Sequence, residues 1–185
     1  MRAILANLGL LSTAMLSACA AVNASNTAPS AGQWVINRQI DRISGQPAPK
    51  VFLEAAATNS RTRKKGASII QLMCFEKQPV VRFAYDFRVG AQTNSVLEYR
   101  FDQNPGHKAT SKILNDYKTI MIQDRTAVQQ FVDELANANV LFVRVTSLQE
   151  GRTEAEYHPP GASVAIEAAY GECPLAPPEP TSPKA

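Results

Sequence analysis

Apolar and polar side chains alternate along two neighbouring segments of the chain, residues 80–89 and 95–102. A period of two gives a strand one apolar and one polar face, so this pattern predicts half-buried antiparallel strands. The segment before them, residues 68–75, is apolar at most positions. Such a strand is typically buried on both faces, and we therefore expect it at the centre of a sheet.

Shorter runs of the same kind predict further strands at residues 33–39, 51–55, 117–122, 141–145 and 153–157. A helix is predicted by the capping-box spacing of Thr126 and Gln129, followed by an apolar stripe at helical spacing up to Leu135. A second, short helix is predicted at residues 163–170, closed by Gly171. Together these elements predict a mainly β, α+β fold, an antiparallel β-sandwich-like domain with two helices.

The N-terminus indicates export. Its apolar segment, residues 3–15, is too short for a membrane-spanning helix and follows a positive residue. It ends in Leu16-Ser17-Ala18-Cys19, which resembles a bacterial lipobox. The resemblance implies cleavage before Cys19 and lipid on its thiol, and the lack of an aspartate at position 20 implies the outer membrane. The alternative is a plain secretory signal that releases a soluble periplasmic protein.

These features divide the chain into four expected parts. Residues 1–18 are the lipoprotein signal peptide. Residues 19–31 form a flexible tether, because small and polar residues cannot bury enough apolar surface to fold. Residues 32–174 are the globular domain, and residues 175–185 are a disordered, proline-rich tail. The predicted location is the periplasmic face of the outer membrane, with a lipid anchor, or otherwise the periplasm.

The number of cysteines is consistent with the predicted periplasmic location. If Cys19 carries lipid, Cys74 and Cys173 remain as a pair in an oxidising environment, where a disulfide is expected. The bond would pin the C-terminal helix to the central strand. Two alternatives stay open, a pair of buried free thiols and a catalytic Cys74 assisted by His107. The second is disfavoured, because a thiol in an apolar central strand is hidden and hard to ionise.

Several short motifs, taken in their order along the chain, resemble those of a known protein family. They are Gly32-Gln33-Trp34, Asp41, the strand ending in Cys74, Val96-Leu97-Glu98-Tyr99-Arg100-Phe101-Asp102, the helix at Phe131 to Leu135, Leu141-Phe142-Val143-Arg144 and the terminal helix into Cys173. This set resembles the type VI secretion-associated VasI/TagO-like envelope proteins. The resemblance covers nearly all of the expected domain and implies an accessory role in secretion.

A candidate anion- or partner-binding site is a crowded basic turn, made of Arg61, Arg63, Lys64 and Lys65. Clustered cations attract anionic surfaces and acidic partners, whereas the alternative is a solvated hairpin tip. A second basic set consists of Arg82, Arg88, Arg100 and Arg144. With Glu98 and Asp102 interleaved, we expect these arginines to form a salt-bridge ladder on the polar sheet face rather than a ligand site.

The remaining chemistry argues for binding rather than catalysis. The net charge of +3 is mild, and we expect no nucleic-acid partner. We predict no catalytic residues, no metal and no cofactor, since the sequence has no nucleophile elbow, phosphate loop or zinc motif. The predicted function is a non-enzymatic envelope lipoprotein that acts as a binding or accessory module for an unidentified envelope or secretion-apparatus protein. The alternative is an enzyme that modifies or hydrolyses an envelope polymer.

Overall fold

One antiparallel sheet makes up most of the domain. The computed structural model describes residues 33–171, 173 and 175, so Cys19, the expected signal peptide and the expected tether lie outside it. The strands are β1 Val35–Asn37, β2 Lys50–Asn59, β3 Lys65–Phe75, β4 Gln78–Tyr85, β5 Ser95–Phe101, β6 His107–Ala109, β7 Lys112–Ile113, β8 Thr119–Ile122, β9 Leu141–Ser147 and β10 Gly151–Tyr157. The helices are α1 Arg125–Leu135 and α2 Ala162–Tyr170. No helix in the described residues is long and apolar enough to cross a membrane.

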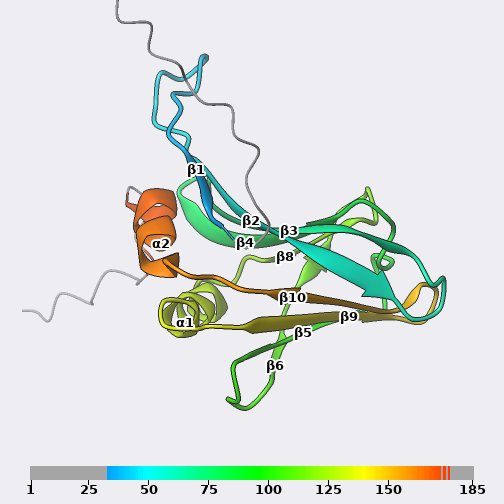
Figure 1. Ribbon diagram of the computed structural model, residues 1–185. Coiled ribbons are helices and arrows are strands. Elements are labelled where there is room, and N and C mark those ends of the chain that lie inside the picture. Colours follow the sequence, from blue (N-terminus) through cyan, green and yellow to red (C-terminus); the bar gives the residue numbers. More distant parts are fainter. Residues whose placement is uncertain (1–32, 172, 174, 176–185) are drawn as a thin grey trace, which may run out of the picture.

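The strand order is β6-β5-β9-β10-β2-β3-β4-β8-β7, and β1 pairs with β2 beside this path. Every pairing is antiparallel. The sheet curls, and both helices lie toward one end of it (Figure 1). Its buried side chains are mostly apolar. The predicted mainly β, antiparallel domain with two helices is therefore confirmed, and its strands form one continuous curled sheet.

Helix α1 closes the curl. Its Phe131 ring lies 5.9 Å from the ring of Phe83 on β4 and 4.9 Å and 5.1 Å from those of Tyr99 and Phe101 on β5. Because β4 and β5 are far apart in the strand order, these contacts join two distant parts of the sheet through one side chain. The edge-on ring geometry adds to the stabilisation that burial provides.

The predicted alternation is confirmed in β4 and β5, where Phe83, Tyr85, Leu97 and Tyr99 are buried. Strand β3 differs from its prediction. It lies inside the sheet, between β2 and β4, but only one of its faces is fully buried. Ile70 and Leu72 are inaccessible, whereas their neighbours on the other face are partly exposed. The expected burial of both faces was wrong, because no second layer covers the outer face of β3 completely.

The start of α1 also differs from its prediction. The N-cap is Asp124, whose Oδ1 accepts a hydrogen bond of 2.9 Å from the backbone N–H of Ala127. Gln129, expected to complete a capping box with Thr126, donates instead to Asp133, one turn later in the helix. Aspartate in extended backbone is as good an N-cap as threonine, and here it begins the helix before Thr126 is reached.

A disulfide fixes the C-terminal end of the domain. Cys74 at the end of β3 is bonded to Cys173, with a Cα–Cα distance of 5.8 Å and 99 residues between the two positions. Tyr170, in the last turn of α2, donates a 2.8 Å hydrogen bond to the carbonyl of Val80 on β4. The cysteine pair thus lies where the sequence predicted, at the end of β3, and the hydrogen bond from Tyr170 adds a contact with β4 that was not predicted.

Candidate functional site

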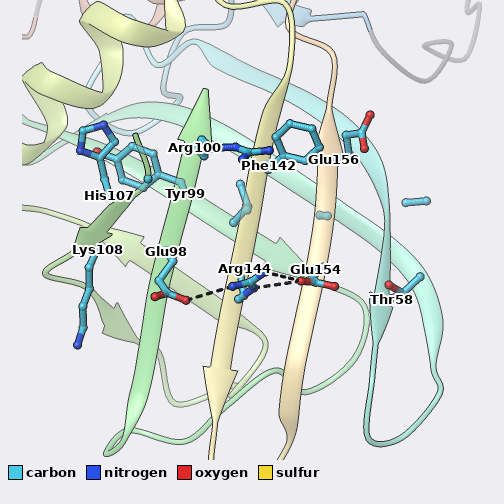
Figure 2. Close-up of a pocket in the computed structure, with 14 residues that line it drawn as sticks. Thr58, Glu98, Tyr99, Arg100, His107, Lys108, Phe142, Arg144, Glu154 and Glu156 are labelled. Carbon is cyan, nitrogen blue, oxygen red and sulfur yellow. Dashed lines mark hydrogen bonds and ion pairs between the residues drawn. The ribbon is translucent and has the colours of Figure 1, made fainter. Parts of the chain in front are cut away.

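A groove of about 760 Å³ crosses the outer face of the sheet. We call it the outer-face groove. The side chains that face it come from alternate positions of β2, β6, β5, β9 and β10, and they are Ala56, Thr58, Glu98, Arg100, Lys108, Phe142, Arg144, Glu154 and Glu156. Alternation explains this set, since the residues between them, such as Tyr99 and Val143, are buried in the core. Figure 2 shows the groove from outside.

The first row of the groove follows the strand register directly. Lys108, Glu98, Arg144, Glu154 and Thr58 stand opposite one another across β6, β5, β9, β10 and β2. Arg144 bridges its two acidic neighbours: its Nε and Nη2 each lie 3.0 Å from Glu154, and its Nη1 lies 3.9 Å from Glu98 (Figure 2). Half-exposed pairs of this kind contribute little to stability, but they hold three charged side chains in defined positions.

The second row is adjacent and less polar. It contains Arg100 on β5, Phe142 opposite it on β9, and Glu156 opposite Phe142 on β10. The guanidinium of Arg100 lies 4.8 Å from the centre of the Phe142 ring, within the range of a cation–π contact. Glu156 lies 3.2 Å from Nε2 of His158. This row gives the groove one aromatic surface flanked by opposite charges.

The two rows together give the groove a charge direction. On the β6–β5 side the cations of Lys108 and Arg100 outnumber the single carboxylate of Glu98, and on the β10 side Glu154 and Glu156 are both carboxylates, with the Arg144 cation on β9 between them. The structure shows no ion pair for Lys108 within its described residues. A ligand with an anionic group at one end, a cationic group at the other and an apolar middle would match this arrangement.

The β6 wall of the groove is held from the core side. The His107 ring stacks on that of Tyr99 at 5.0 Å, and its Nε2 lies 2.8 Å from Glu134 on α1. Burial, and then the nearby Glu134 carboxylate, raise the pKa of Tyr99 to about 12, so the phenol stays neutral. His107 is therefore occupied in joining β6 to α1, and Cys74, its suggested catalytic partner, is in the disulfide. No group of three or more potential metal ligands occurs among the described residues.

The four cations of the basic turn fall into two groups in the structure, Arg61 with hydrogen-bond partners and the other three exposed to solvent. Nη1 of Arg61 donates 2.8 Å hydrogen bonds to the carbonyls of Leu148 and Gln149 in the β9–β10 turn. Gly151 must be glycine here, because its φ is +77° and a Cβ would lie 2.6 Å from Arg61. Arg61 thus fastens two hairpin tips together. The other three cations, Arg63, Lys64 and Lys65, are exposed and fit either a binding site or a solvated tip.

The expected arginine ladder forms only around Arg144. Arg82 donates to Gln71 and Thr119, and Arg88 lies over the Tyr117 ring and near Glu150. Asp102, expected to pair with an arginine, accepts instead from the backbone N–H groups of Asn139 and Val140. The four-arginine ladder was therefore wrong, since Arg82 on β4 and Arg88 just after it are far in the strand order from Arg100 and Arg144 on the paired strands β5 and β9.

Comparison with known proteins adds information about the fold alone. No protein-family model matches the chain, and no curated protein matches its sequence. The domain is similar to the crystal structure of invasion associated protein B from Bartonella henselae, with a TM-score of 0.50 and 12% sequence identity. The match covers 78% of this chain and 96% of that one. At this identity, the likeness shows a shared architecture.

Proposed function

We propose that the protein is an exported, non-enzymatic binding module of the bacterial cell envelope, and that the outer-face groove is its recognition surface. The observation that carries the proposal is the charge pattern across four neighbouring strands, in which Arg144 is held between Glu98 and Glu154 and net positive charge on β6 and β5 faces two carboxylates on β10. Side chains already held by a rigid sheet lose little conformational entropy when a ligand binds, so a groove of this kind favours recognition.

The charge pattern supports an extended segment of a partner protein as the ligand. Such a segment can place an acidic side chain near Arg100 and Lys108 and a basic one near Glu154 and Glu156, with an apolar side chain on Phe142. The resemblance to VasI/TagO-like proteins supports a secretion-apparatus protein as that partner. A component of a type VI secretion system is therefore the first candidate to test.

Removing the two groove cations should weaken partner capture. We expect the Arg100→Ala/Lys108→Ala variant to recover roughly tenfold less partner from bacterial envelopes than wild type, because two charged contacts are lost. The matched control is Arg63→Ala/Lys64→Ala, which removes the same charge from the basic turn. Its capture should fall only at low salt, where long-range attraction steers association, and should equal wild type at moderate salt.

Equal capture by the groove variant and wild type would contradict the proposal. If partner capture is lost only in the basic-turn variant, and at both salt concentrations, the basic turn and not the groove is the recognition surface. Turnover of peptidoglycan or lipid by the purified wild-type protein would contradict the non-enzymatic part of the proposal and favour the alternative of an envelope-polymer enzyme.

Lipidation at Cys19 is tested separately. Cys19→Ala should move the protein from the membrane fraction to the soluble periplasm, because the thiol that would accept the lipid is lost. Fractions are compared after a high-salt wash, which removes protein held only by charge. Mass spectrometry of the wild-type N-terminus should find acyl chains on Cys19. Unchanged membrane association of the variant, with no lipid on the wild type, would exclude the lipobox.

A further inference from the structure

An ordered arm projects from the domain between β1 and β2, residues 38–49 (Figure 1). Its two sides are joined by backbone hydrogen bonds of 2.8 Å, from Asp41 to Gln46 and from Ala48 to Gln39. At its tip, Oδ1 of Asp41 accepts from the backbone N–H groups of Ser44 and Ile43. These hydrogen bonds lower the pKa of the Asp41 carboxyl, and the bond from the Ser44 backbone N–H has the largest effect. The arm therefore has a defined conformation of its own.

The arm presents its large apolar side chains to solvent. Ile43 at the tip is 99% exposed and Ile40 is 59% exposed. Phe75, the last residue of β3, is 52% exposed and lies at the same end of the sheet, because Leu72 of β3 stands opposite Val51 at the start of β2. Single exposed apolar residues are common, but here several gather at one end around a hydrogen-bonded loop.

The charges around these side chains are mostly positive. Arg38, Arg42 and Lys50 are exposed on or beside the arm, and no ion pair among the described residues involves them. The arm itself holds one carboxylate, that of Asp41, which keeps its negative charge while it accepts hydrogen bonds from backbone N–H groups, and exposed Glu76 and Lys77 follow Phe75. The arm thus combines exposed isoleucines with a net positive charge.

We propose that this arm docks onto an anionic phospholipid surface. Ile43 and Ile40 would enter the boundary between headgroups and acyl chains, and the cations would meet lipid phosphates, the combination that holds peripheral proteins at membranes. The arm comprises only residues 38–49, fewer than the roughly 20–30 residues that each partner contributes to a stable protein interface. Strand β2 runs from the arm to the basic turn, so a docked domain holds that turn away from the membrane.

The test uses the chain without its acyl group, residues 20–185, and sedimentation with vesicles of phosphatidylglycerol and phosphatidylethanolamine. Wild type should bind these vesicles, bind less as salt rises, and leave pure phosphatidylcholine vesicles unbound. Ile43→Ser should weaken binding roughly tenfold, since one inserted aliphatic side chain is lost. The matched control is Leu148→Ser, an exposed aliphatic residue at 77% in the β9–β10 turn, which should bind as wild type does.

Three results would overturn the docking proposal: no binding of wild type to anionic vesicles, equal binding by Ile43→Ser, or an equal loss in Leu148→Ser. A photo-crosslinker at position 43 that reacts with a protein instead of lipid in cells would also overturn it. The Arg100→Ala/Lys108→Ala variant should bind vesicles normally, because its substitutions lie in the groove. Failure of the groove proposal and failure of the arm proposal are therefore separate outcomes.

Discussion

Phe131→Ala is expected to lower the free energy of unfolding by about 3–5 kcal/mol, the usual cost of emptying a fully buried aromatic site. The side chain is inaccessible to solvent and touches rings on both β4 and β5. Its loss leaves a cavity at the point where α1 closes the curled sheet. Urea denaturation followed by circular dichroism measures the change.

The control for this prediction lies on the exposed face of the same helix. Thr126→Ala should change stability by less than about 0.5 kcal/mol, as surface substitutions usually do. Because Asp124 and not Thr126 caps the helix, the control also tests the position of the N-cap. A loss below about 1 kcal/mol for Phe131→Ala would mean that α1 does not hold the two parts of the sheet together.

Removing the disulfide is the second large effect. The Cys74→Ser/Cys173→Ser variant should lose about 2–5 kcal/mol, because the bond closes a long loop in the unfolded chain. Its two positions are 99 residues apart. Reduction should destabilise wild type by a similar amount and leave the variant unchanged. Alkylation of both cysteines in unreduced, denatured wild type would show that the bond does not form in the protein.

Much of the fold could be predicted because strand patterns are local. The alternation in β4 and β5 is present in the sequence itself, and so is the apolar stripe that includes Phe131. The short strands β6 and β7 could not be found, since three and two residues are too few to show a period. The partial exposure of β3 depends on which other elements pack against its outer face, and the sequence of the strand alone does not determine that.

The groove could be predicted only in part. The sequence suggested a role for Glu98 and Arg144 together, but Glu154 and Thr58 join them through strand order. The pairing of β5 with β9, and of β10 with β2, crosses long stretches of chain and leaves no local signal. The same reason explains Arg61, whose partners lie in the distant β9–β10 turn.

The most direct test of the central proposal is site-specific photo-crosslinking in living cells. A crosslinking side chain at Thr58, exposed on the β2 side of the groove, should form a discrete adduct with a partner protein. The same group at Val164, exposed on α2 outside the groove, should not form it. The Arg100→Ala/Lys108→Ala substitutions should abolish the adduct at Thr58. An adduct equally strong at Val164, or one that survives these substitutions, would contradict the outer-face groove as the recognition surface.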